Sequence, residues 1–175
     1  MDLFETLVET LKKNPKKIVF TEGTDARILS ATDRLVKAGD FLKPVLVGNV
    51  EAVKAAAAEG GFCIDGAEIV DPENYADMDA MAEKMYELRK GKMDMDTVRA
   101  NLKKGNYFGT MLVKMGVADA LLGGATYSTA DTVRPALQLI KTKPGNKNVS
   151  SCFILVREKD GVEERLAMGD CAIQI

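Results

Sequence analysis

The stretch KIVFTEGTDARILSATDRLVKAG, residues 17–39, decides the fold class. Its first seven residues contain a short apolar run that favours a buried strand. The residues that follow place Ile28, Leu29 and Leu35 on one side of a helix that ends at Gly39. A strand that leads directly into an amphipathic helix is the repeating unit of α/β folds.

The same unit recurs along the chain. KPVLVGN (43–49) precedes an Ala-rich helical run, AEIVDP (67–72) is a third short strand, and VADALLGG (117–124) is a fourth. Short strands separated by helices predict a three-layer α/β domain over residues 1–143, with helices on both faces of a mostly parallel sheet. The predicted strands are 17–21, 44–48, 67–70 and 118–122.

Helices are predicted before Pro15 and, three in number, within residues 75–116. The stripe of Met78, Met81, Met85 and Leu88 is typical of core packing. Residues 144–175 look different, because a Lys-Asp-Gly turn at 159–161 between two apolar runs indicates a hairpin. With an apolar tail over 171–175 and no covering helix, we expect these residues to be the first strands of a second, incomplete α/β domain.

Composition excludes several function classes. The 175 residues are 46% hydrophobic and 29% charged, and 24 basic against 26 acidic residues give a net charge of −2. This predicts a soluble protein without affinity for nucleic acid or membranes. The acidic first residues are unlike a signal peptide, so a cytoplasmic location is expected. The sequence has no His, and its three cysteines lack CxxC spacing, so neither a Ser-His-Asp triad nor a metal site is expected.

The stretch GGATYSTADTVRPALQLIKTKPG, residues 123–145, could hold an anion. A strand, two glycines and a hydroxyl-rich helix start would present free backbone N–H groups and a positive dipole end. Pro135 suggests Thr132 as the N-cap, with residues 128–131 in the turn outside the helix. Arg134 would then reach a ligand near the helix start.

Two further expectations concern this stretch. The helix should bury a stripe of Val133, Ala136, Leu137 and Ile140. Ser, Thr and Asp before a helix can also serve only as caps, and Arg134 could be a structural partner of Asp131, so both alternatives stay open. The stretch matches neither of the two common glycine-rich nucleotide-binding motifs.

The residues of this stretch, together with KKIVFTEGTDARILSA, LKPVLVGN, IVDPENY and YELRKGK, closely resemble the phosphate acetyltransferase family. The resemblance runs from about Phe4 to the end of the chain. It implies two α/β domains of the isocitrate/isopropylmalate dehydrogenase type, an active site between them, and a homodimer at full length. It also implies transfer of an acetyl group between acetyl-CoA and phosphate, which gives acetyl phosphate and CoA. CoA would be a substrate, with no tightly bound cofactor and no metal.

The resemblance also implies binding residues. The arginines of YELRK and DTVRPA are Arg89 and Arg134, and both would hold CoA or phosphate groups. Ser128 and Thr129 match the hydroxyl pair beside the phosphate or acyl site. Arg89 has an alternative explanation, because a cation in the last turn of a helix is favoured by the dipole without any ligand.

Family members are much longer, and their proposed general base would lie beyond Ile175. We therefore expect the catalytic residues outside this sequence and expect the 175-residue chain alone to be inactive. The alternatives are a phosphate butyryltransferase and a non-catalytic fragment that binds CoA or phosphate.

Overall fold

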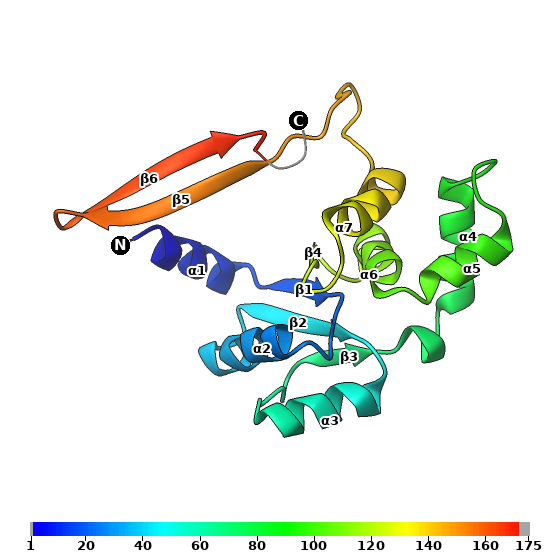
Figure 1. Ribbon diagram of the computed structural model, residues 1–175, viewed down its shortest axis with the longest axis horizontal. Helices are drawn as coiled ribbons and strands as arrows, with labels where there is room; N and C mark the ends of the chain where they lie inside the picture. The colour runs from blue at the N-terminus through cyan, green and yellow to red at the C-terminus, as the bar shows by residue number, and fades with distance from the viewer. Residues whose placement is uncertain (1, 172–175) are drawn as a thin grey trace. The chain divides into compact units, whose positions relative to one another are not determined.

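A computed structural model of the chain describes residues 2–171 (Figure 1). Helix α1 (Leu3–Lys13) opens the chain with a reciprocal cap. The Glu5 N–H donates to Asp2 Oδ1 at 2.7 Å, and the Asp2 N–H donates to Glu5 Oε2 at 3.0 Å. Leu11–Ile140 is one compact unit, and the described residues on either side of it belong to a second unit.

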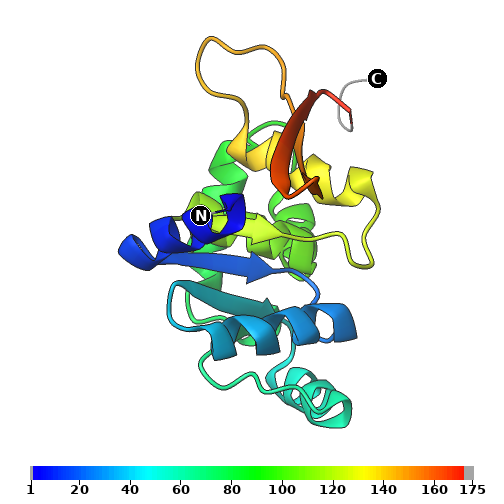
Figure 2. The ribbon, with the colours of Figure 1, turned by 90° about the vertical axis from the view of Figure 1, so that its left-hand side faces the viewer.

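The larger unit is built on four parallel strands. They are β1 (Lys16–Phe20), β2 (Leu42–Val47), β3 (Glu68–Val70) and β4 (Ala120–Leu122). Their order in the sheet is β3-β2-β1-β4, and Figure 2 shows β1 and β2 running in the same direction. Val19 lies opposite Val45 on one side and Leu121 on the other. The prediction of four parallel strands is confirmed.

Helices cover both faces of this sheet, as predicted. Phe20 and Leu46 point to the face covered by α2 (Ala26–Ala38) and α3 (Val50–Gly60). Val19 and Val45 point to the other face, which packs against α4 (Met78–Leu88), α5 (Met95–Leu102) and α6 (Gly105–Lys114). Successive residues of a strand therefore enter different cores, as the period of two requires.

The methionine stripe of α4 is part of the second core. Met81 and Met85 are fully buried, and Met78 and Leu88 pack partly buried against the same cluster. The core-packing interpretation is confirmed. Within residues 2–171, none of the helices combines the length and the apolar character needed to cross a membrane.

The smaller unit contains the predicted hairpin, formed by β5 (Cys152–Lys159) and β6 (Val162–Gly169). Asp160 and Gly161 connect the strands with φ angles of 54° and 76°, the pattern of a type I′ turn. The predicted apolar tail lies, beyond Cys171, outside the described residues. The boundary at residue 143 and the assignment of 144–175 to a second α/β domain stay predictions.

Candidate functional site

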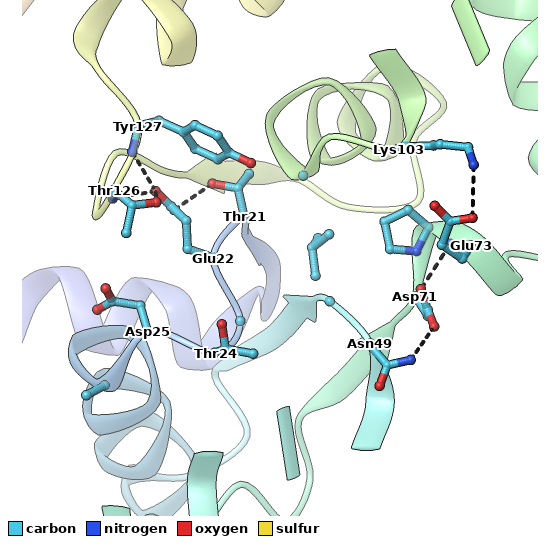
Figure 3. Close-up of a pocket in the computed structure, with 16 residues that line it drawn as sticks. Thr21, Glu22, Thr24, Asp25, Asn49, Asp71, Glu73, Lys103, Thr126 and Tyr127 are labelled. Carbon is cyan, nitrogen blue, oxygen red and sulfur yellow. Dashed lines mark hydrogen bonds and ion pairs between the residues drawn. The ribbon is translucent and has the colours of Figure 1, made fainter. Parts of the chain in front are cut away.

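The carboxyl ends of the four strands surround a cavity of about 720 Å³ (Figure 3). All four strand-end loops contribute to its lining, joined by residues between α5 and α6. These segments are residues 21–26, 47–49, 71–73 and 126–127, together with Lys103 and Gly105. Ligands of open parallel sheets bind at this edge, so the position itself makes the cavity a candidate site.

The strand order places a switch point at this edge. From β1 the chain moves outward to β2 and β3, and it then returns to add β4 on the opposite side of β1. The connections that leave β1 and β4 therefore diverge, and such a divergence opens a crevice at the carboxyl edge. The loop after β1 contains Glu22, and the loop after β4 contains residues 123–128 of the predicted anion site.

Glu22 bridges these two loops. Its Oε1 accepts hydrogen bonds from the backbone N–H groups of Thr126 at 2.9 Å, Gly124 at 3.1 Å and Tyr127 at 3.3 Å. Its Oε2 accepts from the Thr21 hydroxyl at 2.8 Å. The residue is only 9% exposed. The loop therefore does bind an anion, and that anion is a side chain of the same protein.

Burial by itself would raise the pKa of Glu22. The hydrogen bonds donated by Thr126, Thr21, Tyr127 and Gly124 together outweigh burial, and they hold the pKa below its ordinary value of 4.5. The carboxylate is therefore ionised at neutral pH. A lowered pKa makes Glu22 a weaker proton acceptor than an ordinary glutamate, and both of its oxygens already accept hydrogen bonds, which indicates a structural and electrostatic role.

The other acidic side chains of the cavity are also held by partners. Hydrogen bonds and an ion pair from Arg27 lower the pKa of Asp25 to about 2. Hydrogen bonds from the Asn74 side chain and the Glu73 N–H lower the pKa of Asp71. Glu73 forms an ion pair with Lys103 at 3.2 Å. Among residues 2–171, no three acidic or cysteine side chains are grouped as metal ligands.

The glycines of the second loop are required by its packing and its backbone. A Cβ added at Gly123 would lie 2.5 Å from the Thr21 hydroxyl oxygen, and Gly124 has a φ of +106°. Gly123 thus lets the loop approach β1 closely, and Gly124 turns it toward Glu22.

Ser128 and Thr129 begin helix α7 (Thr129–Pro135). Ser128 is the N-cap, because its Oγ accepts from the Asp131 N–H at 3.1 Å and donates to Asp131 Oδ2 at 2.7 Å. The prediction of Thr132 as N-cap was wrong, and residues 129–131 form the first helical turn. The Ser-x-x-Asp spacing was the overlooked signal, since it is close to that of a capping box.

Pro135 consequently lies inside the helix, and its effect there is visible. It has no N–H to donate to the carbonyl of Asp131, and the Asn106 side-chain amide donates to that carbonyl instead at 2.8 Å. The chain then continues as a π-helical turn, η2 (Ala136–Ile140). This change of winding explains why the predicted apolar stripe was wrong: Pro135 and Leu139 are buried, whereas Leu137 and Ile140 are exposed.

The expectation of free N–H groups at this helix start holds for only part of the stretch. The N–H groups of Gly124, Thr126 and Tyr127 donate to Glu22, and that of Asp131 donates to Ser128. These four N–H groups are therefore bonded within the chain, whereas those of Thr129 and Ala130 in the first turn of α7 have no acceptor within residues 2–171.

Arg134 lines a second, smaller cavity of about 200 Å³. Lys104 lines it too, and so does Tyr127, which borders both cavities. Within residues 2–171, the Lys104 ammonium donates only to Asn101 Oδ1, at 3.1 Å, and the Arg134 side chain has neither a hydrogen bond nor an ion pair. Asp131 bonds to Ser128 and not to Arg134. The alternative of a structural Arg134–Asp131 pair is therefore not supported.

Arg89 does not lie at the cavity that Arg134 and Lys104 line. It is the C-cap residue of α4 and lies outside the lining of both cavities. Its Nε atom is buried and has no hydrogen-bond partner within the described part of the chain. The structure thus groups Ser128, Thr129 and Arg134 on one helix and leaves Arg89 on another element.

Comparison with known proteins agrees with this architecture. Residues 2–175 match the family described as phosphate acetyl/butaryl transferase. The chain belongs to this family. It is 45% identical to the phosphate acetyltransferase of Bacillus subtilis (strain 168) over 174 residues, which are 99% of the chain and 52% of that protein.

Two solved structures share the fold. A phosphotransacetylase from Streptococcus pyogenes superposes with a TM-score of 0.87 at 41% identity, over 99% of this chain and 53% of that one. The EutD phosphotransacetylase from Staphylococcus aureus gives 0.85 at 37% identity, over 99% and 52%. The chain therefore spans about half the length of the relatives it matches.

For this member of the phosphate acetyl/butaryl transferase family, two residues of the site escaped the sequence analysis. Glu22 lies in the stretch of residues 17–39, where a charged residue shortly after a buried strand is a signal of a functional position. Lys104 carried no such signal, because only the packing of α6 beside α7 brings it to the cavity of Arg134.

Proposed function

We propose that this protein, at its natural length, catalyses the reversible transfer of an acetyl group between acetyl-CoA and inorganic phosphate. The CoA thiolate attacks the carbonyl carbon of acetyl phosphate, the carbon–sulfur bond forms, and the bond to the phosphate oxygen breaks. Membership of the family and the identity to named phosphate acetyltransferases support this reaction. A homodimer and a cytoplasmic location belong to the same proposal.

Arg134 is the residue we assign most firmly to the substrate. Its guanidinium has no partner within residues 2–171, and it shares a cavity with a second cation, Lys104. Asp131 also lines this cavity and is bonded to Ser128, so the two cations leave a net positive charge that favours a phosphate or phosphoryl group, and a planar guanidinium can bind two of its oxygens at once. Developing negative charge on the acyl and phosphoryl oxygens would be stabilised in the same way.

Ser128, Thr129 and Arg89 complete the proposed binding set, although none of the three lines either cavity. The Ser128 hydroxyl would have to exchange its bond to Asp131 for one to the substrate. Arg89 would act from the end of α4, where its unpartnered Nε atom is consistent with an acceptor supplied by a ligand. The general base for the thiol is expected outside residues 1–175.

The test is anion binding by Arg134 variants. We expect Arg134→Ala to weaken binding of inorganic phosphate or CoA, measured by calorimetry, by about 1.5–3 kcal/mol, the range for losing a charge-assisted hydrogen bond. Arg134→Lys should restore only part of it. Arg99→Ala is the matched control, because Arg99 pairs with Asp79 on an exposed surface outside both cavities. Normal binding by Arg134→Ala would refute the assignment.

Acyl preference and activity need separate assays. Turnover of acetyl phosphate and butyryl phosphate by the protein at natural length distinguishes the acetyltransferase from the butyryltransferase. CoA binding without arsenolysis of acetyl phosphate by the 175-residue chain would identify a binding fragment. Turnover by this chain alone would show that a base beyond Ile175 is not essential.

A further inference from the structure

The carboxylate of Glu22 holds a loop that connects the two cavities. Three N–H groups of residues 124–127 point at one oxygen of this side chain, at 2.9–3.3 Å. Several backbone N–H groups that converge on one point form a nest for an anion. Here the anion comes from the end of β1, which lies next to β4 in the sheet.

The same loop is also held from its carbonyl side. Arg27 Nη2 donates to the carbonyl oxygen of Ala125 at 2.5 Å, and Arg27 is itself fixed by Asp25. The connection after β1 therefore supplies an acceptor for the loop's N–H groups, and the first turn of α2 supplies a donor for its carbonyl group. A loop bound in both ways has few other conformations available.

The loop leads directly to the proposed binding residues. Tyr127 donates its N–H to Glu22, lines both cavities, and is followed at once by the Ser128 cap of α7. Arg134 lies on that helix, one and a half turns further on. The place where α7 begins thus depends on where residues 124–127 are held.

We propose that Glu22 is a positioning residue for substrate binding, whose ionised carboxylate fixes residues 124–127 and through them the cavity face formed by Tyr127 and Arg134. This inference rests on the proposed function. Glu22 lines the larger cavity, but its oxygens are taken by the loop and by Thr21. It therefore acts through the loop and not on the reacting atoms.

Hydrogen exchange of the backbone amides tests the first step. We expect Glu22→Ala to raise exchange at Gly124, Thr126 and Tyr127 by about tenfold or more, because these amides lose their acceptor. Glu22→Gln should raise it less, since it keeps an oxygen acceptor and loses only the charge. Asp119→Asn is the matched control: Asp119 accepts the Lys17 N–H at the other end of the same strand pair, and it should leave the loop unchanged.

Coupling to Arg134 tests the second step. In calorimetry with inorganic phosphate, Glu22→Gln should weaken binding about fivefold in the wild-type background and less than twofold in an Arg134→Ala background, since a positioning effect needs the residue that it positions. In acetyl transfer at natural length, Glu22→Gln should raise KM for acetyl phosphate. Equal effects in both backgrounds would overturn the inference, and so would unchanged loop exchange in Glu22→Ala.

The two proposals fail in different ways. If the wild-type protein neither binds phosphate nor transfers acetyl groups, the proposed function is wrong, and the exchange data still decide whether Glu22 holds the loop. If Glu22→Ala does not fold, Glu22→Gln carries the test, because it has almost the same shape. If Glu22→Gln shows faster loop exchange but keeps wild-type phosphate affinity and KM, Glu22 holds the loop without influencing substrate binding. That result would overturn the inference.

Discussion

A carboxylate ties β1 to β4 at each end of this strand pair, and the two ties differ in their surroundings. At the amino end, Asp119 accepts from the Lys17 N–H at 2.9 Å and from Lys16 Nζ at 3.0 Å, with its side chain 43% exposed. At the carboxyl end, Glu22 is 9% exposed and accepts from three N–H groups of one loop. Water competes at the first site far more than at the second.

The difference follows from the topology of the sheet. At the amino end, Asp119 bonds to a residue of the neighbouring strand, where the sheet itself already fixes the distance. At the carboxyl end the chain leaves the sheet in two directions, and nothing regular joins the two loops. There the ionised side chain of Glu22 links the two loops in place of the backbone hydrogen bonds that join β1 and β4 within the sheet. The candidate site is therefore built where the regular hydrogen bonding of the sheet ends.

The largest expected effect is that of Glu22→Ala. It leaves three N–H groups without their acceptor, and we expect the free energy of unfolding to fall by about 1.5–3 kcal/mol, the range for losing a hydrogen bond to a charged group. Urea denaturation at pH 7 measures the loss. Unchanged stability would mean that water replaces the carboxylate without penalty and that the two ends of the strand pair do not differ.

A smaller loss is expected from Gly123→Ala. The new methyl group would meet the Thr21 hydroxyl oxygen, which also donates to Glu22, and such overpacking destabilises by about 1–3 kcal/mol. The double variant Thr21→Ala/Gly123→Ala should recover part of the loss, because it removes the atom in the way. Thermal unfolding of the two variants and of Thr21→Ala alone decides this. If the double variant recovers no stability, the strain in Gly123→Ala does not come from the Thr21 hydroxyl.

Acidification should reduce the stability that Glu22 contributes at the carboxyl end of the β1–β4 strand pair. Because hydrogen bonds hold the folded pKa of Glu22 below 4.5, its charge stabilises the fold fully above about pH 4.5, and this stabilisation is lost as the pH falls through the folded pKa. The charges that act on it are Arg27 of α2 and, when ionised, Tyr127 of the loop.

The measurement is the stability of wild type minus that of Glu22→Gln between pH 7 and pH 3. We expect a difference of about 1 kcal/mol at pH 7 that shrinks below pH 4.5, since a charged hydrogen bond is roughly twice as strong as a neutral one. A difference that grows on acidification would contradict the assignment of a lowered pKa.

Asp119→Asn should have the smallest effect. Its bonds to Lys17 and Lys16 are shared with water, so we expect the midpoint temperature to change by less than about 3 °C. Differential scanning calorimetry of this variant beside Glu22→Gln gives the comparison directly. If Asp119→Asn is the more damaging of the two, the contrast between the ends of the strand pair is wrong.

Local patterns were enough for the four strands of the larger unit, for its helices before β4 and for the hairpin. Strand positions, the buried methionines of α4 and the turn at Asp160 and Gly161 were predictable because each depends on residues close together in the chain. The start of α7 was missed although Ser128 and Asp131 are also neighbours. There Pro135 suggests a later helix start, whereas the hydrogen bonds between Ser128 and Asp131 set the start at Ser128.

By itself, the sequence determined the fold class and the parallel sheet, because apolar periodicity specifies which face each segment buries. It also indicated the stretch after β4, and not the loop after β1, as a candidate anion site. Only the tertiary structure decided what occupies that site. Glu22 and Gly124 are 102 positions apart, and Asn106 and Asp131 are 25 apart, so no local pattern relates them. Their contacts exist because packing of β4 and α6 against β1 brings unsatisfied backbone groups to side chains that can bond them, and buried polar groups require such partners.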